Sequence, residues 1–303
     1  MKIATTTADF NKYVNTHEEK IELLNKCGFK HIDLSFYGKN DNLPFLKENW
    51  VDYTKLLKEF AETRDMDFVQ AHSIGGNPIE KDENYDFLLK STIRSIEVCG
   101  ILGISNIVVH SGWKAGIKRE EYFKQNLEFF EQLYPAMEKT GVNVLIENSC
   151  KSNMGENWYF SNGSDMREFI EYSGHPQLFA CWDTGHANVE GHQYDDIVSL
   201  GKNLKAIHFN DNRGCSDEHI LPYMGTMSID EIMNGLVDIG FDGAFTFECD
   251  NNIIAGYGWP NSRKEFSKDK RAFKPSLELK MQVEKLMYSI GVEILERYDI
   301  KAE

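Results

Sequence analysis

The sequence predicts a single (β/α)8 barrel, in which parallel strands alternate with helices. Short runs rich in β-branched residues recur along the 303-residue chain, and each is followed by a polar loop and a segment with apolar residues at helical spacing. The eight runs start between 26 and 39 residues apart, which is the length of a strand plus a returning helix. No Gly-x-Gly-x-x-Gly motif follows the first run, which disfavours the main alternative, an open doubly wound sheet.

The strands are expected at eight runs of near-continuous apolar character, as is typical of a parallel sheet covered on both faces. In chain order these are residues 2–7, 31–36, 67–73, 106–112, 143–149, 178–186, 204–212 and 243–249. The helices are expected between them, where apolar residues recur every three or four positions. They are residues 18–26, 53–64, 84–102, 120–139, 164–172, 194–200 and 229–239, and a last amphipathic helix follows Pro275 and Ser276.

No linker or low-complexity segment divides the sequence, so we expect one domain over residues 1–303. Three loops on the expected active face are long, at 37–50, 150–163 and 250–274. Loops after barrel strands usually build the site, so these segments are candidate substrate lids. Ordinary surface excursions and contacts within a homo-oligomer are equally open interpretations.

The composition bears on the class of partner. With 41% hydrophobic residues, the chain has enough apolar material for a large core and too much for a disordered segment. The formal net charge of −15 gives the protein a negative overall electrostatic potential, which opposes the binding of nucleic acid. A local basic groove can still exist in an acidic protein. Six basic residues between 263 and 274 form a cluster that either binds a phosphate or is a solvated face.

The sequence favours a cytoplasmic protein. No apolar stretch approaches the roughly 20 residues that a membrane span needs, so we expect no membrane partner. The six cysteines are scattered, without a Cys-x-x-Cys pair or a compact disulfide framework. Reduced thiols are therefore the better interpretation.

Six consecutive predicted strands end in a side chain that can bind a metal or transfer a proton. In chain order these are His72, His110, Glu147, Asp183, His208 and Glu248. Each alone has a structural explanation, because a histidine can be a hydrogen-bonded core residue and a carboxylate can cap the next helix. Together, Glu147, Asp183 and Glu248 would bring like charges into one barrel mouth without compensation. A bound cation would resolve this conflict.

The donor set indicates the kind of cation. Three carboxylates and one histidine suit Mn²⁺, Mg²⁺ or Co²⁺, and further histidine ligands would shift the preference toward Zn²⁺. We expect a divalent metal cofactor, with Mn²⁺ as the first choice. Cys181 and Cys249 are next to these positions, but no histidine lies at a spacing that predicts a base for a cysteine nucleophile. We therefore interpret both as packing residues.

This ordered set of strand-end residues resembles the xylose isomerase-like barrels, which include sugar-phosphate isomerases, ketose 3-epimerases, inositol-catabolism enzymes and endonuclease IV. The resemblance covers essentially the whole chain, from the first predicted strand to the eighth. It implies that the family's shared divalent metal is held here by Glu147, Asp183, His208 and Glu248.

The similarity to ketose 3-epimerases implies an isomerase or epimerase acting on a sugar or a sugar phosphate. Glu147 and Glu248 would be catalytic, one removing the carbon-bound proton and the other returning it on the opposite face through an enediolate. The substrate-binding residues that the resemblance implies are His186 and Arg213. We also expect His72, His110 and Trp113 to contact the substrate, Trp113 because a flat aromatic face complements the apolar face of a sugar ring. A dehydratase or lyase would pass through the same intermediate and is a lesser alternative.

The similarity to endonuclease IV implies a different activity, cleavage of DNA at abasic sites by three zinc ions. Its nine ligand types are present at His72, His110, Glu147, Asp183, His186, His208, Asp217, His219 and Glu248. The separation between His208 and Asp217 is shorter than expected, and no basic docking loop follows the early strands. Many sugar enzymes of the family also retain the Asp-x-His element, so the sequence favours a small-molecule sugar over nucleic acid. A non-catalytic binding protein on a decayed barrel is a third class, against which the intact ligand set argues.

Overall fold

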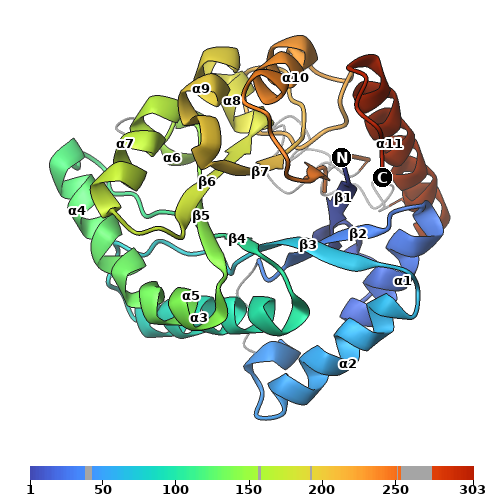
Figure 1. Cartoon of the computed structure of the whole chain (residues 1–303), viewed down its shortest axis with the longest axis horizontal. Helices are drawn as coiled ribbons and strands as arrows, with labels where there is room; N and C mark the ends of the chain where they lie inside the picture. Colours follow the sequence, from blue (N-terminus) through green and yellow to red (C-terminus); the bar gives the residue numbers. More distant parts are fainter. Residues whose placement is uncertain (38–42, 156–157, 192, 251, 254–274) are drawn as a thin grey trace, which may run out of the picture.

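Eight parallel strands form the barrel wall at the centre of the computed structural model, which describes residues 1–37, 43–155, 158–191, 193–250, 252–253 and 275–303 (Figure 1). The strands are β1 (Ile3–Thr6), β2 (His31–Ser35), β3 (Asp67–His72), β4 (Asn106–Val108), β5 (Asn143–Glu147), β6 (Leu178–Asp183), β7 (Leu204–His208) and β8 (Phe245–Phe247). Each strand pairs with the next one from β1 to β7, and β1 also pairs with β8. The N–H of Phe209, directly after β7, donates to the Thr246 carbonyl oxygen of β8 at 2.7 Å and closes the ring. The predicted (β/α)8 barrel is confirmed.

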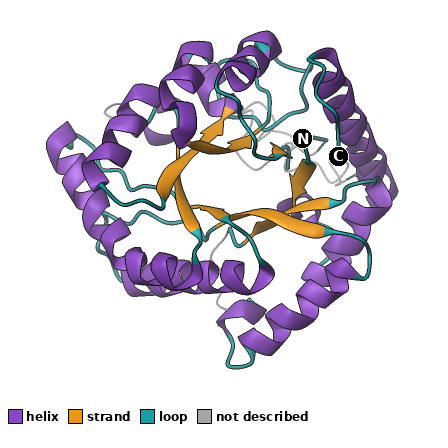
Figure 2. Cartoon of the chain, in the orientation of Figure 1, coloured by secondary structure: helices purple, strands orange, loops and turns teal. Residues whose placement is uncertain are grey.

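Helices surround the strands (Figure 2). They are α1 (His17–Cys27), α2 (Trp50–Glu62), α3 (Tyr85–Leu102), α4 (Arg119–Phe130), α5 (Tyr134–Thr140), α6 (Lys151–Met154), α7 (Gly163–Ser173), α8 (Thr184–Glu190), α9 (Tyr194–Leu200), α10 (Ile229–Asp238) and α11 (Leu277–Arg297). The described residues also include the 3-10 turns η1 (Thr7–Phe10), η2 (Pro44–Leu46), η3 (Glu131–Leu133) and η4 (Gly201–Asn203). Within the described ranges, none of these helices is both long and apolar enough to cross a bilayer.

The bounds of several predicted elements differ from the structure; the fourth strand, for example, ends at Val108 and the seventh at His208. The helix expected at 120–139 is divided into α4, η3 and α5, because Pro135 in the first turn of α5 has no N–H to continue the hydrogen-bond ladder of α4. The strand expected at 178–186 ends at Asp183. The Asp183 carboxylate caps α8 by accepting a hydrogen bond from the His186 N–H at 2.6 Å.

The barrel interior has an apolar floor under a polar mouth. Side chains alternate across each strand, so residues two positions apart share a face. The inward-facing Glu147, Asp183 and His208 each follow, by two positions, a member of a small buried apolar cluster. That cluster consists of Val108, Leu145, Cys181 and Ala206. The chemistry-bearing residues therefore lie at the C-terminal mouth of the barrel, where the loops after the strands gather.

Candidate metal centre

Four strand-end residues meet at the barrel mouth and are called the carboxylate cluster below: Glu147, Asp183, His208 and Glu248. Each offers one ligand atom, and these four atoms lie within 4.8 Å of one another. Glu147, Asp183 and His208 are almost completely buried, and the side chain of Glu248 is 20% exposed. Glu147, Asp183 and His208 end the neighbouring paired strands β5, β6 and β7. Closure of the barrel between the end of β7 and β8 adds Glu248 to them.

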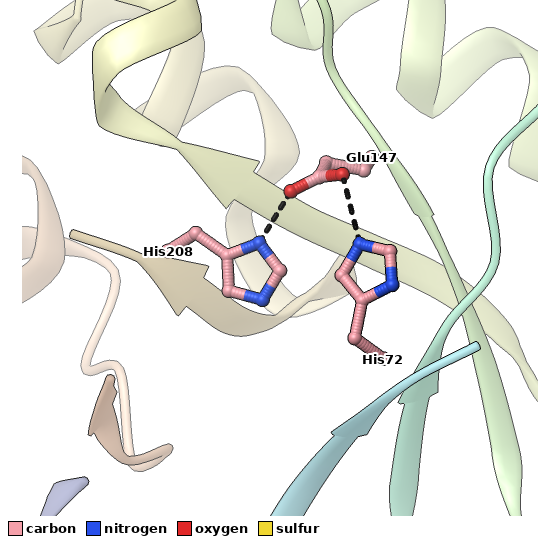
Figure 3. A group of neighbouring side chains, drawn as sticks. All are labelled: His72, Glu147 and His208. Atoms are coloured by element: carbon pink, nitrogen blue, oxygen red, sulfur yellow. Dashed lines mark hydrogen bonds and ion pairs between the residues drawn. The ribbon is translucent and has the colours of Figure 1, made fainter. Parts of the chain in front are cut away.

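Glu147 is the hub of this cluster. One of its carboxylate oxygens is hydrogen-bonded to His208 Nδ1, which also lies 3.3 Å from Glu248 Oε2. The other oxygen lies 2.7 Å from His110 Nε2 and 3.8 Å from His72 Nε2. Figure 3 shows His72 and His208 on either side of the Glu147 carboxylate. The predicted neighbours His72 and His110 therefore contact the cluster directly.

Neighbouring residues fix the orientation of the ligands. Asn210 Nδ2 donates to Asp183 Oδ2 at 2.7 Å, while the other Asp183 oxygen caps α8. Asp33, on β2, has its carboxylate 3.8 Å from His208 Nε2 and is only 1% exposed. The sequence analysis missed Asp33 because it does not end its strand. A lone acidic residue inside an otherwise apolar run was the available signal.

Burial and charge push the pKa values of the two glutamates in opposite directions. Burial raises the pKa of Glu248 to about 7. Burial also acts to raise the pKa of Glu147, but the charge of His208 and the hydrogen bonds from His110 and His208 hold this pKa well below its ordinary value. Pairs of carboxyl groups with separated pKa values are typical of acid and base partners.

A second group beside it is called the Asp217 cluster: His186, Asp217 and His219. Asp217 Oδ2 lies 3.0 Å from His186 Nε2, and Asp217 Oδ1 lies 3.0 Å from His219 Nε2. His219 adopts a φ of 51°, a left-handed conformation that is uncommon for residues other than glycine. Its Nδ1 donates to the Glu248 carbonyl oxygen at 2.8 Å, which joins the two clusters.

Both clusters border one cavity of about 590 Å³ at the barrel mouth. His72, His110, Tyr37 and Trp158 also line it. In the part of the chain that the structure describes, no lysine or arginine lines this cavity. The basic residues expected between 263 and 274 lie outside the described residues.

Two predicted substrate contacts are not brought to the cavity. The Arg213 guanidinium pairs with Glu218, and its side chain is 61% exposed. Trp113 is half-buried against the hydrophobic core, and its carbonyl oxygen accepts a hydrogen bond from Asn77 Nδ2 at 2.5 Å. The other predicted residues line the cavity or lie beneath it, in the two clusters.

The residues of the carboxylate cluster fit a divalent cation. Three buried carboxylates face one another, and the described part of the cavity offers only histidines to balance them. Buried like charges are costly unless they are paired or coordinate a metal. Oxygen ligands with one imidazole are a donor set that Mn²⁺, Mg²⁺, Co²⁺ and Zn²⁺ accept.

A family model described as the xylose isomerase-like TIM barrel matches residues 21–274. The chain belongs to this family. The resemblance predicted from the strand-end residues is confirmed. The match includes the strand ends that form the barrel mouth described above.

Relatives of this xylose isomerase-like barrel have been named as enzymes of two kinds. The fructoselysine 3-epimerase of Escherichia coli O157:H7 is 28% identical over 127 residues, 40% of this chain and 43% of that protein. A probable endonuclease 4 of Cenarchaeum symbiosum is 27% identical over 153 residues, 45% of this chain and 52% of that protein. An uncharacterised protein of Methanocaldococcus jannaschii is 25% identical over 186 residues, 58% of this chain and 61% of that protein. In each case the match spans less than two thirds of the relative's length.

Solved structures match over nearly the whole chain. A D-tagatose 3-epimerase-like protein superposes with a TM-score of 0.74 at 18% identity, covering 99% of this chain and 98% of that one. The protein IolI, solved with a bound zinc atom, superposes with a TM-score of 0.73 at 18% identity, covering 98% and 99%. At this identity the likeness concerns the fold alone.

Proposed function

We propose that the protein is a divalent-metal-dependent isomerase or epimerase of a sugar or a sugar derivative. The observation that carries the proposal is the meeting of Glu147 and Glu248 in one cluster beside one cavity. Two carboxylates that face a common substrate are the minimum machinery for removing a carbon-bound proton and returning it. The fructoselysine 3-epimerase among the relatives supports the same class of reaction.

The residues have distinct roles in the proposed reaction. Glu147, Asp183, His208 and Glu248 would hold the cation, which supplies Lewis-acid polarisation of the substrate carbonyl. One glutamate removes the proton from the carbon next to the carbonyl, and the substrate passes through an enediolate. The other glutamate returns a proton on the opposite face. His72, His110 and His186 offer hydrogen bonds to the hydroxyl groups of a sugar.

Mn²⁺ is our proposed metal because oxygen ligands dominate the carboxylate cluster. Zn²⁺ is the alternative that the neighbouring histidines favour. The zinc atom bound to the similarly folded IolI protein supports that alternative.

A second candidate function, cleavage of DNA at abasic sites, is favoured by one observation. All nine residues that resemble the endonuclease ligands lie in or beside the two adjoining clusters. Phosphate-backbone binding normally needs basic side chains around the site, and no described residue of that kind lines the cavity. A small-molecule sugar therefore fits the described cavity better than nucleic acid.

Solvent-deuterium exchange tests the proposal. Protein stripped of metal and reloaded with Mn²⁺, Mg²⁺, Co²⁺ or Zn²⁺ is incubated in D2O with ketoses, aldoses and their phosphates, and deuterium uptake is read by mass spectrometry. We expect metal-dependent uptake beside the carbonyl of at least one sugar, whether the product is an epimer, an isomer or an elimination product. Glu147→Gln and Glu248→Gln should lower uptake at least 100-fold, consistent with loss of a general base.

Glu171→Gln is the matched control, because Glu171 is an exposed carboxylate of α7 outside both clusters and outside the cavity lining. It should retain exchange. If no sugar exchanges and the protein instead cleaves abasic DNA with bound metal, the sugar assignment is wrong and the second candidate replaces it.

A further inference from the structure

The Asp217 cluster has the geometry of a cation site. His186 Nδ1 donates to the Asn148 carbonyl oxygen at 2.9 Å, and His219 Nδ1 donates to the Glu248 carbonyl oxygen at 2.8 Å. Each ring therefore turns its Nε2 toward Asp217, at 3.0 Å in both cases. Two imidazoles and one carboxylate form a donor set that Zn²⁺ accepts in proteins.

A side chain from the short helix α6 already contacts this cluster. Asn153 Nδ2 lies 2.8 Å from Asp217 Oδ2 and 3.2 Å from His186 Nε2. The amide nitrogen carries two N–H donors, so it interacts with the same two atoms that would bind a cation. A metal ion that binds both of these atoms must compete with the Asn153 amide.

Local structure holds Asn153 in this place. It belongs to α6, a short helix after β5 that follows the fully buried Cys150. The Asn153 N–H donates to the Cys150 carbonyl oxygen at 3.0 Å. The Lys151 N–H donates to Glu190 Oε1 of α8 at 2.7 Å, and α8 also carries His186. The helix that carries Asn153, α6, is thus hydrogen-bonded to α8, the helix that carries His186.

We propose that Asn153 keeps metal ions out of the Asp217 cluster and so limits the number of metals at the barrel mouth. With Asn153 in place, the cluster offers hydrogen-bond donors and acceptors to substrate hydroxyl groups instead of a Lewis acid. The substrate part of this inference rests on the proposed function, whereas the metal part does not. Asn153 would also distinguish this chain from an endonuclease IV-like enzyme with three metal ions, which needs His186, Asp217 and His219 as metal ligands.

Metal content tests the proposal. Wild-type protein, Asn153→Ala and Asn153→Asp are loaded with excess Zn²⁺, freed of unbound metal by gel filtration and measured by elemental mass spectrometry. We expect both variants to hold about one more Zn²⁺ per chain than the wild type, because both expose the His186, Asp217 and His219 donors. Asn153→Asp should bind the additional ion more tightly than Asn153→Ala, since it adds a carboxylate ligand.

Two further variants locate the additional ion. Ser152→Ala, one residue earlier in α6, is the matched control and should keep the wild-type zinc count. Adding Asp217→Ala to Asn153→Ala should remove the extra zinc. Equal zinc counts in folded wild type, Asn153→Ala and Asn153→Asp would overturn the proposal. Absence of sugar exchange would contradict the proposed function but not this inference, because the zinc count needs no substrate.

Discussion

At the residue scale, the imidazole of His208 lies between carboxylates on both sides. Its Nδ1 faces Glu147 and Glu248, while its Nε2 faces Asp33 at 3.8 Å. Neither Asp33 oxygen has a hydrogen-bond partner among the described residues. A carboxylate behind a metal-binding histidine fixes the ring's orientation and tautomer. We therefore assign Asp33 the role of a positioning residue for His208.

This role predicts a loss of metal affinity when the carboxylate is removed. Asp33→Leu, similar in size but without an acceptor, should weaken metal binding about 10- to 100-fold, whereas Asp33→Asn should weaken it less. Competition with a chelating dye measures the affinity directly. Gln70→Leu is the control, because Gln70 is a buried polar residue of the neighbouring β3 that contacts Thr246 instead of a metal ligand. Unchanged affinity in a folded Asp33→Leu protein would contradict the assignment.

Strand-end position predicted most of the site at this scale. Residues such as Glu147 and Glu248 follow apolar runs. Because the C-terminal ends of all strands meet at one end of a (β/α)8 barrel, this position alone places them at the same mouth. Asn153 could not be predicted, because α6 is a single short helical turn with no periodic pattern that gives the direction of its side chains. Arg213 was implied only by the resemblance to the ketose 3-epimerases, and in the structure it pairs with the carboxylate of Glu218 instead.

At the scale of elements, α11 anchors the segment that follows β8. Lys280 and Glu284 on α11 are fully buried and form an ion pair of 2.6 Å. The Asn252 amide joins the pair, accepting from Lys280 and donating to Glu284, both at 2.8 Å. The helix thus holds the chain four residues after Glu248.

Breaking this pair should be costly. Lys280→Met leaves the Glu284 carboxylate buried without its partner, and we expect the free energy of unfolding to fall by about 3–5 kcal/mol in urea melts. The double variant Lys280→Met/Glu284→Leu should recover part of the loss, since the Glu284 charge is removed while the nearby buried carboxyl of Asp9 remains. Arg297→Met removes an exposed pair of the same spacing in α11 and should change little. Equal losses in Lys280→Met and Arg297→Met would contradict this view of α11.

His17, the first residue of α1, makes stability depend on pH. Burial, followed by the charge of Lys20, lowers the pKa of His17 to about 3. The unfolded chain binds a proton below about pH 6.5 and the folded chain does not, so stability is lost as pH falls. Protonation of His17 in the unfolded chain should lower the free energy of unfolding by about 2 kcal/mol between pH 7 and pH 5. His17→Asn should lose correspondingly less stability than the wild type over the same range, and parallel losses in chemical melts would refute the assignment.

Element boundaries were less predictable than the elements themselves. Apolar periodicity identified all eight strands, but it could not show that Asp183 ends β6 by capping α8. The hydrogen bond that stops the strand depends on the local turn, which apolar periodicity does not encode. The same turn places His186 at the edge of the Asp217 cluster.

At the scale of the whole molecule, closure of the barrel creates the site. Glu147 and Glu248 are separated by a hundred residues of sequence and share a cluster because β7 and β8 complete the ring. The repeated strand and helix pattern predicted this closure. The contact of Asn153 with Asp217, on which we propose that the number of metals depends, was not predictable, because it joins two segments that lie outside the strands.

The most direct test of the central claim is to locate the metal by anomalous X-ray scattering in crystals loaded with Mn²⁺. We expect a peak bound by Glu147, Asp183, His208 and Glu248, with ligand distances of about 2.0–2.4 Å. A fully loaded crystal with no peak between these four residues, or with metal only at other sites, would show that they do not form the metal site.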